Sequence, residues 1–236
     1  MKTIGLLGGM SWESTELYYR HINEGIKTRL GGLHSAKIAL VSVDFQEIET
    51  LQHQGDWAAA GQQLAKAAQS VEAAGADFLL ICTNTMHKVV PAIESVIQIP
   101  VLHIADATAA AIKAKGLQTV GLLGTQFTME QAFYKDRLID QHGLHVLVPS
   151  AGDRAIIHRI IYEELCLGVI NPASRHEYLR IMADLKQQGA EGIIAGCTEI
   201  TLLVKQADLD TPLLNTTAIH ADAAVTHALN ELPPNP

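Results

Sequence analysis

Two stretches of the chain, "AGADFLLICTNT" (residues 74–85) and "QGAEGIIAGCTE" (residues 188–199), share one pattern. Each places a glycine before an apolar run that stops at small polar residues, and Gly75 pairs with Gly189, 114 positions later. A short apolar run bounded in this way is typical of a buried strand. The two stretches therefore predict the same strand and the same following turn at two places in the fold.

Other parts of the chain repeat at nearly the same distance. The segment "IGLLGG" (4–9) recurs as "VGLLGT" (120–125), and "PVLHIADATAAA" from Pro100 is echoed by "PLLNTTAIHADAA" from Pro212. Since the three pairs follow one another in the same order, we interpret them as a duplicated βα unit. Two similar α/β halves are expected, with corresponding loops at the carboxyl ends of their sheets, where ligands bind in open α/β folds.

Short β-rich runs alternate with helical stretches along the whole chain. Apolar strands separated by helices predict mostly parallel sheets covered on both faces. We expect one α/β domain from residues 1–102 with 212–236, and a second from 103–211. The expected strands are 3–7, 37–43, 77–81, 101–104, 119–123, 145–148, 192–195 and 212–214. Helical spacing joins Trp57, Leu64, Ala68 and Val71, and again Ile157, Ile160, Ile161 and Leu165.

The composition excludes several classes of function. The 236 residues are 48% hydrophobic, enough for a large core, and carry a formal charge of −8, which argues against binding to nucleic acid or to an acidic membrane surface. Three cysteines without a CxxC pair suggest a reduced, cytoplasmic protein. No run approaches the roughly 18 apolar residues of a membrane span.

Cofactor motifs are also missing from the sequence. The eleven histidines show no HxH or HExxH spacing, so we expect no metal site. The glycine-rich "GLLGG" (5–9) matches neither a dinucleotide fingerprint nor a P-loop, which makes nucleotide binding a weak interpretation.

The repeat decides between two neighbouring candidates at the end of the strand 77–81. At an offset of 114, Cys197 corresponds to Thr83, whereas Cys82 corresponds to Gly196. Because successive side chains at a strand end point in opposite directions, Cys82 and Thr83 should not both face a ligand. We expect Thr83 to face the ligand and Cys82 to pack as a small buried hydrophobe.

Cys197 lies between a strand end and an expected helix start. The positive end of a helix dipole would favour its thiolate, and the backbone N–H groups of Thr198, Asn84 and Thr85 could receive a carboxylate. A thiolate beside a carboxylate site suggests proton abstraction or nucleophilic attack. A buried strand-end cysteine without chemistry is the alternative.

Five motifs together carry a family resemblance: "IGLLGGMS", "CTNTMH", "LLGT", "IIYEELCLG" and "GCTEI". In this order, over essentially the whole chain, they resemble the aspartate/glutamate racemase family. The resemblance implies two pseudo-symmetric, Rossmann-like α/β domains with the active site in the cleft between them. It also implies a homodimer that acts on a small amino-acid substrate without pyridoxal phosphate or any other cofactor.

Members of that family use two cysteines on opposite faces of the substrate α-carbon. The second motif is intact here at Cys197, but the first has Thr83 where the family has cysteine. The resemblance thus implies Thr83 and Cys197 as the catalytic pair. Since a threonine hydroxyl is a far weaker acid than a thiol, we expect an asymmetric enzyme in which Cys197 removes the α-proton efficiently, from the L-enantiomer.

Substrate selectivity departs from the aspartate-specific relatives, which carry an arginine after the second strand and a lysine in a helix of the second half. Here the stretch "VSVDFQEIETLQ" (41–52) contains no arginine, and Cys166 stands where the lysine is expected. A bidentate arginine is hard to replace. A broader range of amino acids is therefore expected, with Gln52 offering a neutral hydrogen bond.

Further residues complete the predicted substrate site, each with a structural alternative. Met10 would line the floor of the cleft or fill the core. Thr125 would contact substrate or cap a helix. Asn84 and Thr85 would bind the α-carboxylate, cap the next helix, or do both. Among the remaining polar residues, Glu199 and Glu164 could orient the site, and His87 is interpreted as a structural hydrogen-bonder.

Two kinds of alternative function remain open. The near one is another isomerase or lyase of the same superfamily: a hydantoin racemase, a maleate cis–trans isomerase or a decarboxylase. The distant one is a non-catalytic protein that binds an amino acid, in which Thr83 marks a lost activity.

Overall fold

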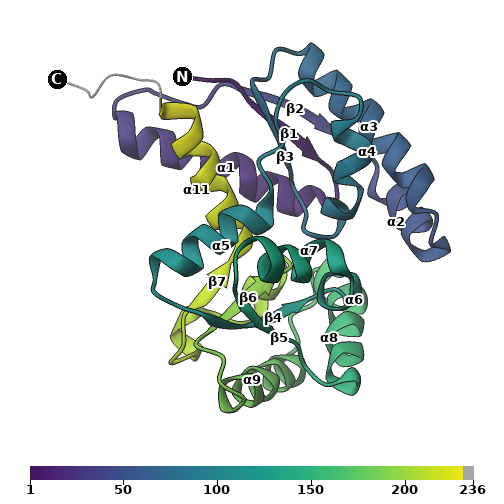
Figure 1. Cartoon of the computed structure of the whole chain (residues 1–236), viewed down its shortest axis with the longest axis vertical. Helices are drawn as coiled ribbons and strands as arrows, with labels where there is room; N and C mark the ends of the chain where they lie inside the picture. Colours follow the sequence, from purple (N-terminus) through teal and green to yellow (C-terminus); the bar gives the residue numbers. More distant parts are fainter. Residues whose placement is uncertain (231–236) are drawn as a thin grey trace. The chain divides into compact units, whose positions relative to one another are not determined.

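A computed structural model describes residues 1–230 of the protein, so residues 231–236 of the expected first domain lie outside the described part. The chain divides into two compact units (Figure 1). The first contains Met1–Ile104 and the residues from His220 onward, and the second contains Ala105–Ile219. Both are α/β units with parallel sheets, as predicted.

The first unit is built on a sheet of order β2-β1-β3. The central strand β1 (Ile4–Gly8) pairs in parallel with β2 (Ile38–Ser42) and with β3 (Phe78–Ile81). Its helices are α1 (Trp12–Leu30), α2 (Phe45–Gln54), α3 (Trp57–Ala73), the short helix η1 (Thr85–Val89), α4 (Val90–Glu94) and most of α11 (Thr216–Leu229).

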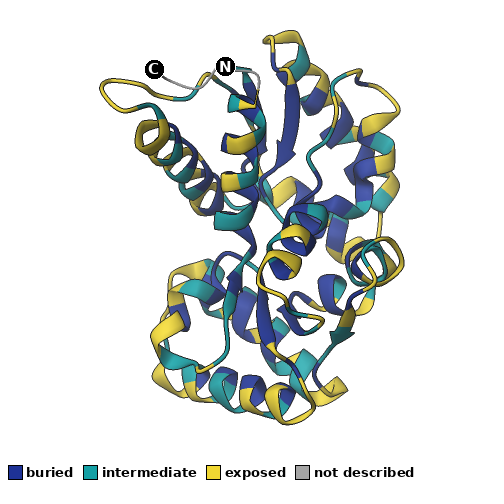
Figure 2. Ribbon diagram, turned by 60° about the vertical axis from the view of Figure 1, so that its left-hand side comes forward, coloured by how far each residue is buried: buried dark blue, intermediate teal, exposed yellow. Residues whose placement is uncertain are grey.

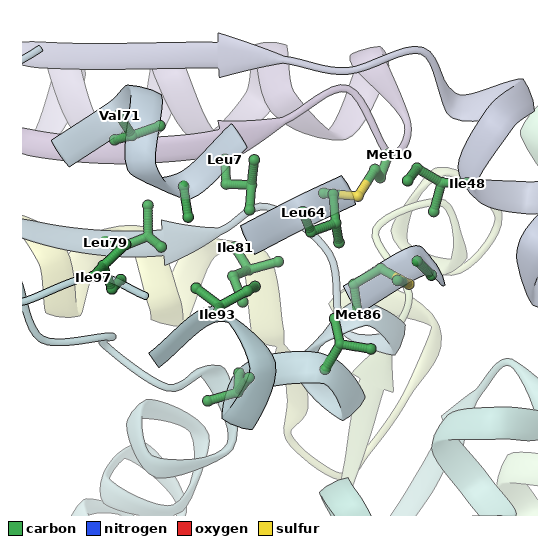
Figure 3. Packing of buried hydrophobic residues seen from close by; sticks show 14 of the residues in the cluster. Leu7, Met10, Ile48, Leu64, Val71, Leu79, Ile81, Met86, Ile93 and Ile97 are labelled. Carbon is green, nitrogen blue, oxygen red and sulfur yellow. The ribbon is translucent and has the colours of Figure 1, made fainter. Parts of the chain in front are cut away.

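Alternating side chains of β1 and β3 supply two apolar clusters, one on each face of this sheet. Leu7, Leu79 and Ile81 pack with α3 and α4 in one cluster (Figure 3). Leu6 and Phe78 pack with α1 and α11 in the other. The strands are consequently buried, whereas the outward faces of the helices are exposed (Figure 2). Period-two alternation between two covered faces explains why these strands are apolar throughout.

The second unit has a sheet of order β5-β4-β6-β7. All its pairings are parallel, and its strands are β4 (Thr119–Gly124), β5 (His145–Leu147), β6 (Gly192–Gly196) and β7 (Leu213–Asn215). The helical elements are α5 (Ile104–Ala114), α6 (Gln126–Glu130), α7 (Ala132–Asp136), η2 (Arg137–Gln141), α8 (Ala151–Glu163), η3 (Leu165–Leu167), α9 (Pro172–Gln187), α10 (Ile200–Leu203) and η4 (Gln206–Asp208).

The two sheets repeat the same register. Ile4 lies opposite Phe78 in the first sheet, and Val120 lies opposite Gly192 in the second. Val120 follows Ile4 by 116 positions and Gly192 follows Phe78 by 114, which are the offsets of the sequence repeat. The isolated bridge from Leu79 to Val101 likewise corresponds to the pairing of Ile193 with Leu213. The repeat therefore extends from sequence to strand pairing.

Two boundaries differ from those expected. The strand predicted at 101–104 is reduced to the single bridge at Val101, because helix α5 already begins at Ile104. The stretch 212–219, predicted with the first domain, belongs to the second unit, because β7 pairs with β6. The chain instead passes between units at Ile104 and, inside α11, at Ile219.

A helix packs closely on a glycine of the central strand in each unit. A Cβ added at Gly5 would lie 2.6 Å from Cγ1 of Val71 and 2.8 Å from the carbonyl oxygen of Phe78. At the equivalent Gly121 it would lie 2.9 Å from the Cδ1 atoms of Leu185 and Ile193. The first site is closed by a strand carbonyl as well as by the branched side chain of Val71, whereas the three nearest atoms at the second all belong to longer, more flexible side chains.

We predict that Gly5→Ala lowers the free energy of unfolding by about 3 kcal/mol and Gly121→Ala by about 1 kcal/mol, because a neighbouring strand yields less readily than a leucine or isoleucine tip. Urea unfolding of both variants beside the wild-type protein tests this order. Equal losses, or a larger loss at Gly121, would contradict the explanation.

Candidate active site

The turn after β3 carries the first predicted catalytic residue. β3 ends at Ile81, Thr83 is half-buried, and η1 begins at Thr85. The carbonyl oxygen of Thr83 lies 2.8 Å from Nδ1 of His87, while its hydroxyl makes no hydrogen bond to any residue that the structure describes. The backbone of Thr83 is thus held in place, and its hydroxyl remains available to a ligand.

Cys82 is a packing residue, as predicted. It is fully buried in the cluster formed by β3, α1 and α11, on the same side as Phe78 and Leu80. Burial raises the pKa of the Cys82 thiol far above its ordinary value. Cys82 therefore packs in the core as an uncharged thiol.

Cys197 follows β6 directly and is half-buried. Its Sγ donates a hydrogen bond to Oε2 of Glu199 at 2.9 Å. The pKa of the thiol is raised well above its usual value, first by burial and then by the negative charge of Glu199, with a further contribution from Cys166. The resting side chain is therefore a protonated thiol paired with a carboxylate.

The expectation that a helix dipole makes Cys197 a thiolate is wrong. The helix after it, α10, begins only at Ile200 and is four residues long. The N–H of Ile200 is also engaged, because it donates to the carbonyl oxygen of Cys197 at 3.2 Å. A short helix that starts three residues later supplies little field, and the nearby carboxylate acts in the opposite direction.

Acidic groups gather around Tyr178 of α9, a residue that the sequence did not single out. Burial raises the pKa of its phenol, and the nearby acidic groups of Cys197, Cys166 and Glu164 raise it further. The hydroxyl of Tyr178 donates to the carbonyl oxygen of Ile157 at 3.3 Å. In the sequence Tyr178 looks like one more apolar position of a helix, so only the fold shows that it adjoins Cys197.

Glu164 is anchored rather than solvated. Its side chain is 14% exposed, and its Oε2 accepts a hydrogen bond of 2.6 Å from the hydroxyl of Ser174. Glu199 is buried as well. Of the two carboxylates proposed to orient the site, Glu199 touches the thiol, and Glu164 forms part of the acidic surroundings.

The residues expected to bind the substrate carboxylate are buried at the two strand ends. Asn84 and Thr85 follow Thr83, and Asn84 makes no side-chain capping bond to η1. Thr198 follows Cys197, and its Oγ1 lies 2.9 Å from Oγ1 of Thr217. The capping role considered for the Asn84 side chain is therefore not used in this structure.

The other predicted contacts have structural partners. Thr125 caps α6, since its Oγ1 accepts the N–H of Thr128 at 3.3 Å. Met10 belongs to the apolar cluster of the first unit, close to Ile48 (Figure 3). Gln52 is also buried there, with its Nε2 2.8 Å from Sδ of Met86. All three side chains have partners within the protein, and their direct contact with substrate remains a prediction.

Within residues 1–230, no three or more histidine, cysteine or acidic side chains are grouped so that they could hold a metal ion. Over the same residues, no helix has both the length and the apolar character needed to span a membrane.

We predict that Glu199→Gln lowers the pKa of Cys197, because the variant removes the charge that opposes the thiolate. Alkylation by iodoacetamide, followed as a function of pH with each cysteine peptide resolved by mass spectrometry, measures the change. The midpoint for Cys197 should move to lower pH in Glu199→Gln and stay in place in Glu163→Gln, whose carboxylate lies at the exposed end of α8. An unchanged or higher midpoint in Glu199→Gln would contradict the assigned cause.

Known proteins of similar structure cover nearly the whole chain. The crystal structure of a candidate Asp/Glu racemase from Yersinia pestis is 58% identical, covers 97% of this chain and 100% of its own, and has a TM-score of 0.92. The structure of PH1733, an aspartate racemase homologue from Pyrococcus horikoshii OT3, is 32% identical, with 97% and 99% covered and a TM-score of 0.84.

Sequence comparisons point to the same group of racemases as the structural ones. The broad specificity amino-acid racemase RacX of Bacillus subtilis is 24% identical over 162 residues, which make up 67% of this chain and 68% of RacX. The model of the Asp/Glu/hydantoin racemase family matches residues 7–224. The chain therefore belongs to the Asp/Glu/hydantoin racemase family.

Proposed function

We propose that this protein is a cofactor-independent amino-acid racemase in which Cys197 removes the α-proton and Thr83 acts on the opposite face of the α-carbon. The observation that carries the proposal is the thiol–carboxylate pair of Cys197 and Glu199 at the end of β6. In the repeated register, the matching position after β3 is Thr83. Two equivalent strand ends thus present two unequal acids.

The first step makes a base from a protonated thiol. The carboxylate of Glu199, 2.9 Å from Sγ, accepts the thiol proton, and the resulting thiolate takes the α-proton of the L-enantiomer. Backbone N–H groups at Asn84, Thr85 and Thr198 receive the substrate carboxylate in the proposed complex.

The second step returns a proton to the other face. The Thr83 hydroxyl donates its proton to the α-carbon, which gives the D-enantiomer, and recovers one from water. Glu199 then releases the proton that it had accepted to the hydroxide so formed, and both residues return to their resting state. In the reverse direction the same hydroxyl would have to act as a base, although its acidity lies far below that of a thiol, whose pKa is about 8.5. Exchange of the α-proton should therefore be much faster from L-substrates than from D-substrates, while inversion is limited by the Thr83 step in both directions.

The substrate range is proposed to extend beyond aspartate and glutamate. No arginine occurs in the stretch 41–52, which runs from the end of β2 into α2, and Cys166 of η3 occupies the place of the expected lysine. The relative RacX, described as an amino-acid racemase of broad specificity, supports the same proposal. The side chain of Gln52 would have to leave Met86 to serve as a substrate contact.

An amino-acid-binding protein without catalysis is the alternative, favoured by the threonine at position 83. A binding protein would show a thermal shift with an amino acid but no exchange of its α-proton. The racemase requires the exchange.

We predict that α-proton exchange in heavy water, followed by NMR across a panel of L- and D-amino acids, is at least roughly 10-fold faster from the L-enantiomer of the best substrate. Cys197→Ser should lose about 100-fold or more of this exchange, in the range typical of a general base. Thr83→Ala should keep exchange from the L-enantiomer while losing inversion, and Thr83→Cys should raise exchange from the D-enantiomer.

Cys82→Ala is the matched control, since its thiol lies in the core beside the same turn. It should leave both exchange and inversion close to the wild-type values. Equal exchange from both enantiomers in the wild-type protein would contradict the asymmetry, and full activity of Cys197→Ser would contradict the mechanism.

A further inference from the structure

Three buried histidines lie together behind the Thr83 turn. His87 of η1 has its ring centroid 4.6 Å from that of His103 and 5.9 Å from that of His220. All three belong to the first unit and are no more than 6% exposed. Buried histidines need partners for both ring nitrogens, so their hydrogen bonds show what each ring holds.

The partners of His87 fix its tautomer. Nδ1 lies 2.8 Å from the carbonyl oxygen of Thr83, which can only accept, so Nδ1 carries the proton. Nε2 lies 3.2 Å from the backbone N–H of Ile104, which can only donate, so Nε2 is the acceptor. The neutral ring therefore spans from the Thr83 turn to the first residue of α5.

The neighbouring histidine is fixed in the opposite tautomer. Nε2 of His220 donates to the carbonyl oxygen of Leu102 at 2.7 Å, and its Nδ1 accepts from the hydroxyl of Tyr18 at 2.8 Å. The backbone of Leu102 is thus bonded to His220, and the backbone of Ile104 is bonded to His87. The segment 102–104, on which the His87 ring rests, is therefore anchored at both ends.

The charge state of His87 agrees with this arrangement. Burial lowers the pKa of the ring well below its ordinary value, and the neighbouring His103 and His220 lower it further. Burial also lowers the pKa of His220 to about 4. A neutral His87 keeps one donor and one acceptor, whereas a protonated ring would present two donors and lose the bond from Ile104.

We infer that His87 is a positioning residue for Thr83, which it holds through the Nδ1–H bond to the Thr83 carbonyl; this inference rests on the proposed function. The bond fixes the backbone of the residue whose hydroxyl delivers the second proton. Proton transfer depends steeply on donor position, so a small shift of Thr83 should weaken inversion. Removal of the first proton by Cys197 does not involve this bond.

Two substitutions separate the two bonds of the ring. In His87→Asn the side-chain amide occupies the place of Nδ1 and can still donate to Thr83, but nothing reaches Ile104. In His87→Gln the amide occupies the place of Nε2 and can still accept from Ile104, but the bond to Thr83 is lost. Both variants replace an aromatic ring in the core, so both should lose stability to a similar extent.

The readout is the ratio of inversion to exchange when an L-amino acid is incubated in heavy water. Exchange with retention yields the α-deuterated L-enantiomer, and inversion yields the deuterated D-enantiomer, which chiral chromatography with mass detection resolves. We expect His87→Gln to lower the ratio about 10-fold with exchange within about twofold of wild type, and His87→Asn to keep the ratio.

The outcomes are distinct. An unchanged ratio in His87→Gln, or an equal fall in both variants that follows their loss of thermal stability, would overturn the positioning role and leave the proposed racemase intact. If the wild-type protein shows no exchange with any amino acid of the panel, the proposed function fails before the variants are compared.

Discussion

The parallel pairing of a central strand with its neighbour, β1 with β3 and β4 with β6, determines where every candidate residue lies. Because both pairs keep the same register, both neighbouring strands bring their chains to the carboxyl edge at equivalent positions. Side chains then alternate between the two faces of each sheet. A shift of the β3 register by one residue would turn Cys82 to the side that Thr83 now faces, and Thr83 into the core.

The same constraint gives the two strand ends different chemistry. After β6 a thiol and a carboxylate are two positions apart and joined by a hydrogen bond, and burial and charge together raise the pKa of Cys197. After β3 a hydroxyl stands on a backbone held by a neutral histidine. The two strand ends therefore share one backbone arrangement but carry side chains of very different acidity, a thiol at Cys197 and a hydroxyl at Thr83.

Much of the fold could be predicted because parallel strands buried on both faces leave a strong apolar pattern. The repeat placed β1, β3, β4 and β6, and it correctly assigned Cys82 to the core. The predicted thiolate of Cys197 was wrong because the length of α10 and the orientation of Glu199 depend on tertiary packing. Tyr178 was missed because a helical tyrosine in an apolar position shows nothing of its neighbours.

Neither copy of the duplicated segment contains all the helices of one unit. Helix α5 follows the strand bridge at Val101, yet all but its first residue lies in the second unit, where Thr108 and Asp106 bond to Tyr134 and Arg137. Helix α11 follows β7, yet its Ala221 and Val225 complete the core of the first unit. The last helix of each copy thus packs in the unit formed mainly by the other copy. Domain-swapped dimers exchange an element between two chains in the same way, whereas here both copies belong to one chain. In a chain made of the first copy alone, the face of the sheet that α1 and α11 cover together would be left partly open.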